Sequence, residues 1–178
     1  MLRRNVENGI PAAIRYLGNC YEEGDLGLVP SHKKAARLLQ RAADLGDVLA
    51  MHNLGFLYER GEGIKLDLKK TVKYWRMAAE QGMASAQYNL GTSYERGEGV
   101  AQDYAEAARL YKLAADQGHT KAEYNLGVMY YCGNGFARDI AEGIFWLKRA
   151  AAKGNKRAKD ALTEIEALRP RAPPRRHG

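Results

Sequence analysis

The sequence has few of the residues that mark several common protein classes. It has only two cysteines, and none of its four histidines pairs with a cysteine at the spacing of a metal site. Few valines and isoleucines stand in alternating runs, which disfavours β-sheet, whereas abundant alanine favours helix. No apolar stretch approaches the length of a membrane span, and the first residues lack the apolar region of a secretory signal. These absences predict an all-α protein in the cytoplasm or another soluble intracellular compartment.

Acidic residues are fewer than basic ones, but the imbalance is uneven along the chain. The net charge is +7, and four of the arginines lie in the final stretch RPRAPPRRHG. Without these four the chain has 24 basic and 21 acidic residues, so its body is only mildly basic. A nucleic-acid-binding domain usually carries a stronger and more clustered excess. Nucleic acid is therefore not the expected partner.

One pattern recurs along the chain at a nearly constant interval. The pattern Ala-x-x-x-Leu-Gly-x-x-Tyr begins at Ala13, Ala50, Ala86 and Ala122, at intervals of 37, 36 and 36 residues. A degraded fifth copy begins at Ala158. A fixed period of about 20–50 residues indicates an array of stacked structural units.

Each unit has a second half with its own helical pattern. In residues 103–118 the apolar positions recur at spacings of three and four and form one stripe. Asp103 stands at the expected N-cap, and Glu106 is placed to complete a capping box. The equivalent N-caps are Ser31, Asp67 and Asp139, a second capping box has Glu142, and the helix-ending glycines are Gly46, Gly82, Gly118 and Gly154. Each unit is therefore predicted to be a helix A, a turn and a helix B.

Each helix A contains a glycine where helix propensity disfavours one. These glycines are Gly18, Gly55, Gly91 and Gly127. A mid-helix glycine costs roughly 1 kcal/mol relative to alanine, so its recurrence predicts that helix B packs closely at that point. The tyrosine one turn later is predicted to fill the space between neighbouring units. Because neither helix can bury its apolar face alone, the units must stack.

In the second, third and fourth units, helix A is followed by a Gly-x-Gly loop, which could be a turn or a phosphate-binding loop. The loops are RGEG at 60–63 and 96–99, and CGNG at 132–135. A dinucleotide-binding fingerprint needs a preceding strand and a third glycine, but positions 66, 102 and 138 are Leu, Gln and Arg. We therefore interpret the loops as turns and expect no cofactor.

The complete unit resembles the Sel-1-like repeat, a relative of the tetratricopeptide repeat with a longer turn. The copy at 86–118, AQYNLGTSYERGEGVAQDYAEAARLYKLAADQG, matches the repeat pattern nearly throughout, and the resemblance covers about residues 10–168. It implies a right-handed α-α solenoid of paired antiparallel helices that binds a protein or peptide partner. The first unit departs from the pattern by an extra residue in its turn near Pro30, and the cysteine pairs of secreted members are absent.

The repeats predict the organisation of the chain. Residues 1–9 form a remnant of a preceding helix B or an N-terminal cap, 10–46, 47–82, 83–118 and 119–154 form four repeats, 155–169 form a C-terminal capping helix, and 170–178 form a disordered basic tail. The first residues leave open whether the chain is cut from a longer array. In the capping helix, Ala158, Leu162 and Ile165 can face the array while charged residues face water. We expect a monomer.

By analogy with tetratricopeptide arrays, the A helices line the concave groove where a partner would bind. The predicted groove residues are Arg15, Asn19, His52, Asn53, Phe56, Tyr88, Asn89, Thr92, Tyr124, Asn125 and Val128. Asn53, Asn89 and Asn125 recur every 36 residues. This amide ladder either binds the backbone of an extended peptide or ties neighbouring repeats together. The aromatic residues would hold partner side chains.

Other notable residues have structural interpretations. Cys20 and Cys132 lie three repeats apart, too far for a disulfide, and are predicted to be free thiols. His119 follows a helix-ending glycine and is predicted to be exposed, and Glu95, at a helix end, to be solvated. Trp75 and Trp146 are predicted to be packing residues. The run of Lys69, Lys70, Lys73 and Arg76 is interpreted as a solvated outer face or, alternatively, as a contact for an acidic surface.

Two further function classes stay open. The arginine-rich tail could bind nucleic acid or an acidic surface through its positive charge. Some proteins that resemble this family have been linked to β-lactam or cell-wall chemistry. However, the sequence shows no clustered Ser/His/Asp set and no cysteine–histidine pairing to activate a nucleophile. The sequence therefore predicts a non-catalytic scaffold or adaptor without a metal site.

Overall fold

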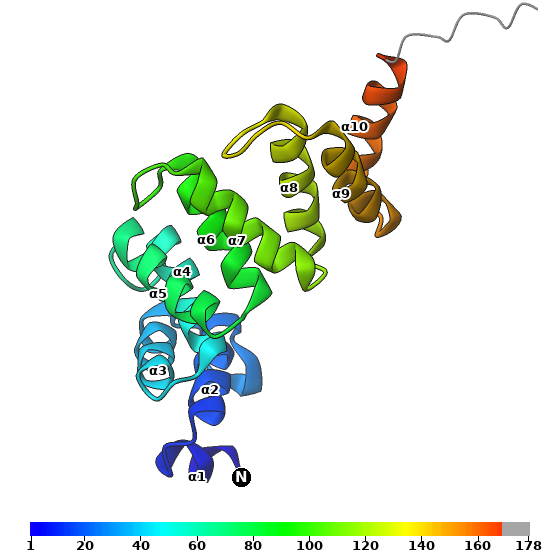
Figure 1. The fold of residues 1–178 in the computed structure, drawn as a ribbon. Helices are drawn as coiled ribbons and strands as arrows, with labels where there is room; N and C mark the ends of the chain where they lie inside the picture. Colours follow the sequence, from blue (N-terminus) through cyan, green and yellow to red (C-terminus); the bar gives the residue numbers. More distant parts are fainter. Residues whose placement is uncertain (169–178) are drawn as a thin grey trace, which may run out of the picture.

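The computed structural model describes residues 1–168, which form ten α-helices packed in sequential pairs (Figure 1). The helices are α1 (Leu2–Glu7), α2 (Pro11–Glu23), α3 (His32–Asp44), α4 (Val48–Arg60), α5 (Leu68–Glu80), α6 (Ala84–Arg96), α7 (Tyr104–Asp116), α8 (Thr120–Cys132), α9 (Ile140–Ala152) and α10 (Lys156–Ala167). A short 3₁₀ turn, η1 (Asp25–Gly27), follows α2. The A helices are α2, α4, α6 and α8, and each is followed by its B helix, α3, α5, α7 or α9. Helices pack chiefly on their neighbours in sequence, so the predicted all-α solenoid is confirmed.

The side chains predicted to cap the B helices do so. The Asp67 carboxylate accepts from the N–H of Lys70 at 3.0 Å, and the helix ends before Gly82, which has a positive φ of 85°. The other three caps accept in the same way: Ser31 from Lys34, Asp103 from Ala105 and Glu106, and Asp139 from Glu142. Local sequence signals thus set where these helices begin and end.

The predicted capping boxes are wrong. The N–H of Asp103 donates to the carbonyl of Tyr94, in the preceding A helix, at 2.9 Å. Because this N–H already has a partner, the Glu106 carboxylate pairs with Arg109 instead. The second box fails in the same way, with Asp139 donating to Tyr130 and Glu142 accepting from the indole of Trp146.

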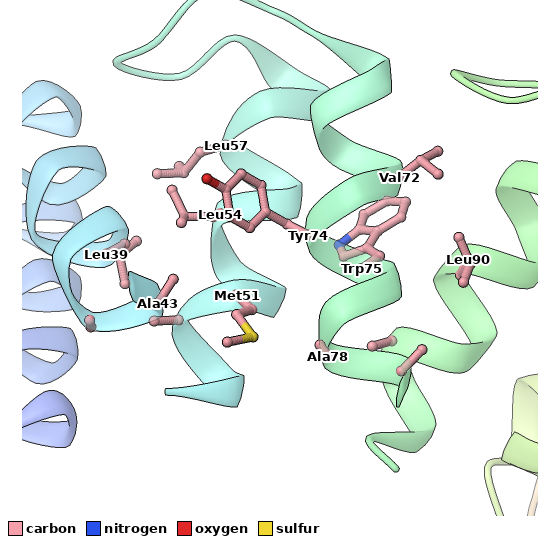
Figure 2. Close-up of a cluster of buried hydrophobic side chains, with 14 of the residues drawn as sticks. Leu39, Ala43, Met51, Leu54, Leu57, Val72, Tyr74, Trp75, Ala78 and Leu90 are labelled. Atoms are coloured by element: carbon pink, nitrogen blue, oxygen red, sulfur yellow. The ribbon is translucent and has the colours of Figure 1, made fainter. Parts of the chain in front are cut away.

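The mid-helix glycines let each B helix approach its A helix closely, as predicted. A Cβ on Gly55 would overlap the indole of Trp75, whose Nε1–H donates to the carbonyl of His52 at 3.3 Å. The equivalent glycines face Leu39 (Gly18), Tyr111 (Gly91) and Leu147 (Gly127). Figure 2 shows buried Trp75 within the apolar cluster that α3, α4, α5 and α6 share. Trp146 is also buried, as predicted for a packing residue.

The Gly-x-Gly loops are turns between helices, as predicted, and they also join consecutive repeats. Gly61 ends α4 with a left-handed conformation. The second glycine, Gly63, lies so close to the backbone of His32, at the start of the preceding B helix, that a Cβ would overlap it. Gly99 has the same relation to Leu68, and Gly135 to Tyr104. Each loop therefore holds its repeat against the one before.

The apolar interior runs through the stack. One buried cluster extends from Ile14 of α2 to Leu110 of α7, and the next lies among α7, α8 and α9. Tyr94 packs against both clusters, which is the role predicted for the tyrosine of the repeat. Cys20 is buried, Cys132 is exposed, and both are free thiols, as predicted.

The two ends of the described chain are closed by single helices. At the first, α1 packs on α2, and Arg41 donates to the carbonyl of Val6 at 3.4 Å. At the other end, Ala158, Leu162 and Ile165 of α10 pack against α9, in line with a capping helix. Every helix in residues 1–168 is too short or too polar to cross a membrane. The predicted basic tail at 170–178 lies outside the described residues.

Candidate partner-binding face of the A helices

The predicted groove residues form one continuous row across the four A helices. All of them are partly exposed. They are Arg15 and Asn19 on α2; His52, Asn53 and Phe56 on α4; Tyr88, Asn89 and Thr92 on α6; and Tyr124, Asn125 and Val128 on α8. The repeat period brings them together because each A helix presents the same turn to the same side of the stack.

Part of this row surrounds a hollow of about 510 Å³. We call it the A-helix hollow. Its lining residues are His52, Phe56, Ser85, Tyr88, Asn89, Gly118, His119, Thr120 and Lys121. They come from three consecutive repeats, so no single repeat could form the hollow.

Aromatic rings form one wall of the A-helix hollow. The His52 ring meets the edge of Phe56 at a centroid distance of 4.9 Å, and Phe56 in turn meets Trp75 at 5.4 Å. Also in the lining, the ring of Tyr88 stacks on that of His119 at a centroid distance of 4.7 Å. Because these rings are supported from behind by the core, they are held in place before any partner binds.

Both imidazoles in the hollow are neutral near pH 7. Burial lowers the pKa of His52 below its ordinary value. Burial also lowers the pKa of His119, helped by the positive charge of Lys121 and opposed by Glu123. Neutral His52 can accept at Nε2 from the side-chain N–H of Asn89, a contact of 3.0 Å. Protonating His52 would remove this acceptor.

The amide ladder ties repeats together, which was one of the two interpretations left open. Asn53 Nδ2 donates to Asn19 Oδ1 at 3.3 Å, and Asn89 contacts His52 of the preceding A helix. The amide of Asn125 interacts with the hydroxyl of Tyr111, in the preceding B helix. All three asparagines nevertheless remain partly exposed.

Other predicted groove residues are also held by neighbouring repeats. Arg15 Nε lies 3.0 Å from the carboxylate of Asp47, which is the N-cap of the next A helix. Tyr124 and Val128 pack against the last apolar cluster, and the guanidinium of Arg157 lies 4.8 Å from the centre of the Tyr124 ring. The open part of the row is therefore the A-helix hollow and not its C-terminal end.

Sequence reasoning missed His119 as a member of the site. The prediction that it is exposed is wrong, because it is half-buried and its Nδ1 accepts from the N–H of Ala122 as the N-cap of α8. Aligning the repeats with one another could have revealed this role. Asp47 and Asn155 stand at the position equivalent to His119, and both cap the helices that they precede. The prediction for Glu95 is also wrong, since it is partly buried and accepts from the Tyr111 hydroxyl at 2.6 Å.

One group of three potential metal ligands comes together within residues 1–168. Glu22, His32 and Glu62 place their ligand atoms within 4.8 Å of one another. Burial, and then the charge of Glu62, raises the pKa of the Glu22 carboxyl. The guanidinium of Arg60 already lies 3.9 Å from Glu62. Two carboxylates and an imidazole are a suitable donor set, but surface donors alone do not make a site.

One short pattern in the chain is shared with serine enzymes that use a lysine beside the nucleophile. Residues Ser31 to Lys34 form a Ser-x-x-Lys pattern. In the structure the Ser31 hydroxyl accepts from the backbone N–H of Lys34 as a helix cap, and the Lys34 ammonium lies 4.8 Å from the centre of the Tyr21 ring. Both side chains therefore have structural partners, and neither activates the other.

The repeat architecture and its spacing agree with a known family. The family model described as Sel1 repeat matches residues 11–47, 48–83, 84–119 and 120–155. The chain belongs to the Sel1 repeat family. Each matched Sel1 repeat contains one A helix and the B helix that follows it. Scaffolds of this kind are typical of protein binding.

Solved Sel1 repeat proteins are close in structure. A protective antigen of uropathogenic Escherichia coli with the SLR fold is 35% identical, with a TM-score of 0.89, over 92% of this chain and 35% of its own. A Sel1 repeat protein from Oxalobacter formigenes is 33% identical, with a TM-score of 0.85, over 89% of this chain and 63% of its own. The chain thus spans about a third of the first protein and under two thirds of the second. A search of curated proteins gives no match.

A more distant likeness concerns the fold alone. Cysteine-rich protein B from Helicobacter pylori is 23% identical, with a TM-score of 0.58, over 73% of this chain and 93% of its own. In the present chain both cysteines are free thiols. Its Sel1 repeats therefore fold without a disulfide.

Proposed function

We propose that this chain is a non-catalytic scaffold that binds an extended segment of a partner protein across the A-helix hollow. The observation that carries the proposal is the hollow itself, which three consecutive Sel1 repeats build from partly exposed aromatic and amide side chains. Its volume of about 510 Å³ lies in the range of natural ligand pockets, roughly 300–1,000 Å³. One or two side chains of a bound segment would fill it.

The residues of the hollow have distinct roles in this proposal. Phe56 and Tyr88 offer apolar ring surface, and tyrosine is enriched among residues that dominate binding energy. Ser85 and Asn89 offer hydrogen bonds to the backbone of the bound segment. Lys121, at the rim, is exposed and would pair with an acidic side chain of the partner. The rigid wall lowers the ordering cost of binding.

Filling the hollow tests the proposal without disturbing the core. Peptides selected from a random displayed library for binding to the chain are measured against wild type and Ser85→Arg. The long arginine side chain would occupy the hollow, so affinity should fall about tenfold or more, equivalent to about 1.4 kcal/mol. Thr163→Arg at an exposed position of α10, outside the hollow, adds the same charge and side chain and is the matched control, which should bind like wild type. If Ser85→Arg melts like wild type and still binds the peptides equally well, the hollow is not the binding site.

A further inference from the structure

Positive charge gathers on the outer sides of two neighbouring B helices, α3 and α5. We call this surface the basic face, and it consists of the exposed side chains of Lys33, Lys34, Arg37, Arg41, Lys69, Lys70, Lys73 and Arg76. The same two helices contain only two acidic residues, Asp44 and Glu80. By contrast, the four A helices together hold four basic and five acidic residues. The excess is therefore local to this face.

The cations of the basic face have no carboxylate partners. None of the eight forms an ion pair within residues 1–168. The next B helix, α7, is different, because Arg109 pairs with Glu106 at 2.7 Å and Lys112 with Asp116 at 3.2 Å. Pairing of this kind neutralises a surface, whereas the unpaired cations of α3 and α5 leave a positive field over theirs.

Several of these cations are held in position by aromatic rings. The distances from the cation to the ring centre are 4.8 Å for Lys34 and Tyr21, 5.0 Å for Lys70 and Tyr58, 5.6 Å for Lys73 and Tyr74, and 6.0 Å for Arg76 and Tyr94. A ring attracts a cation without removing its charge. The face thus presents its charges in a set arrangement.

A second hollow lies at the α3 side of the basic face, where α3, α4 and the loop that follows α4 meet. Its volume is about 370 Å³, and its lining includes the apolar side chains of Ala36, Leu54 and Ile64, with Lys33 and Arg37 beside them. Nearby, the Tyr74 hydroxyl of α5 donates to Gln40 of α3 at 2.8 Å, which fixes the two helices relative to each other. An apolar recess bordered by cations is therefore built into the face.

We propose that the basic face binds an acidic segment of a partner protein, with an apolar side chain of that segment in the hollow that α3, α4 and the loop after α4 line. Unpaired cations provide attraction and steering, and the recess provides a place for an anchor residue. The hollow of this site shares no lining residue with the A-helix hollow, so the site is separate from it and does not rest on the function proposed above.

The shape of the face favours a protein segment over other anionic partners. The phosphates of a nucleic acid would pair with the cations but leave the apolar recess empty. A membrane surface is usually bound with apolar side chains that point outward, whereas the outward positions here carry lysine and arginine. An acidic segment with one apolar residue uses both features of the face.

The test uses the whole chain and a fluorescent peptide of Glu, Asp and Ser around one Leu. Fluorescence anisotropy compares wild type with Lys33→Glu/Arg37→Glu and with Lys148→Glu/Lys159→Glu, a control with the same charge change at exposed positions on α9 and α10. We expect the first pair to weaken binding at least about tenfold and the control pair to have little effect. Replacing the peptide's Leu with Ser should weaken binding to wild type as well. Every variant keeps the arginine tail, so the tail cannot explain a difference between the pairs.

Three results would overturn the proposal. Equal losses in both variant pairs would show attraction to net charge alone. Binding that is indifferent to the peptide's Leu would show that the recess is unused. Tighter binding of duplex DNA or phosphatidylserine vesicles, lost in the same variant, would assign the face to those partners instead. If Lys33→Glu/Arg37→Glu does not fold, as judged by circular dichroism, Lys69→Glu/Lys73→Glu on α5 makes the same comparison.

Discussion

Gly55 and Gly18 occupy the same position in two A helices, but what they face differs. A Cβ on Gly55 would overlap the rigid indole of Trp75, whereas one on Gly18 would meet Leu39 Cγ at 3.2 Å. We expect Gly55→Ala to lower the free energy of unfolding by about 1–3 kcal/mol through overpacking. Gly18→Ala should cost less, because its Cβ meets only the flexible Leu39 side chain, while the gain of about 1 kcal/mol in helix propensity is common to both variants. Urea denaturation of both variants checks this order, and equal losses would contradict it.

His52 makes the stability of the fold depend on pH. Burial lowers its pKa in the folded chain, so the unfolded chain takes up the proton first as the pH falls. The stability that neutral, buried His52 contributes to the folded chain is therefore fully present above the ordinary pKa of 6.5. It is lost as the pH falls toward the lower pKa of the folded chain. We expect His52→Gln, whose amide oxygen can still accept from Asn89, to reduce the loss of stability at low pH. The part of that loss that comes from His119 should remain.

Denaturant titrations at pH values on both sides of 6.5 measure this effect. The slope of unfolding free energy against pH should be smaller in His52→Gln than in wild type. An Arg15→Lys variant, changed elsewhere in the same row, keeps its charge and should retain the wild-type slope. Identical slopes in wild type and His52→Gln would show that His52 is solvated in the folded chain.

Single residues could be predicted from the sequence where the cause is local. Asp67 and Gly82 mark the two ends of one helix through bonds and angles within a few residues of themselves. The partners of Asn53 and Asn89 could not be predicted in this way, because they depend on how one A helix is placed beside the next. Whether Asn89 also meets a partner's backbone stays a prediction.

At the scale of an element pair, α8 and α9 are joined by a buried charge. Glu123 is fully buried, and its Oε1 lies 2.8 Å from the ammonium of Lys153 and 3.0 Å from the guanidinium of Arg149. At the same positions the preceding repeat has a neutral pair, with Gln117 donating to Gln87 at 2.8 Å. The same pair of positions in a repeat can therefore be joined by an ion pair or by a hydrogen bond between two neutral amides.

Removing both cations should expose the cost of that buried carboxylate. We expect Arg149→Gln/Lys153→Gln to lose about 3–5 kcal/mol of unfolding free energy, because Glu123 is left without a cation. Adding Glu123→Gln should restore most of the loss, because it recreates the Gln87–Gln117 pair of repeat 3. Guanidinium denaturation measures the unfolding free energy of the double and triple variants. A triple variant no more stable than the double would show that the buried charge of Glu123 is not the cause of the loss.

Elements as a whole were the most predictable level of this protein. The pattern occurs in four copies, so each helix start and helix end can be compared at four places. A position that is ambiguous in one copy is resolved by another. The capping boxes failed because that prediction considered the B helix alone. In the structure the N–H of Asp103 is already bonded to Tyr94, a residue of the preceding helix. The basic face was half visible in the sequence as the α5 run, while α3 supplies the other half only after the repeats stack.

At the scale of the whole molecule, stability should follow the coupling between neighbouring repeats. Gly99 and Gly82 both have positive φ, 73° and 85°, so any side chain strains the backbone at either position. Only Gly99 lies against the preceding repeat, where a Cβ would overlap the backbone of Leu68, while Gly82 has open space. We expect Gly99→Ala to broaden the unfolding transition, whereas Gly82→Ala shifts its midpoint alone.

Calorimetry and hydrogen exchange distinguish the two variants. In Gly99→Ala, repeats 1 and 2 should exchange separately from repeats 3 and 4, because the joint between them is weakened. In Gly82→Ala, exchange should rise evenly through the stack. Equal cooperativity in the two variants would mean that the loop contact does not couple the repeats.

The loop glycines meet three different residues at the start of the preceding B helix, His32, Leu68 and Tyr104, and in each case they touch its backbone. A joint made of glycine against main chain does not discriminate among side chains. This contact therefore places no demand on the side chain that it meets, and it can recur unchanged when the array is lengthened in whole units. A duplicated segment 83–118 inserted after Gly118 would extend the A-helix row by one unit, and with it the length of chain that a partner could lay along the surface.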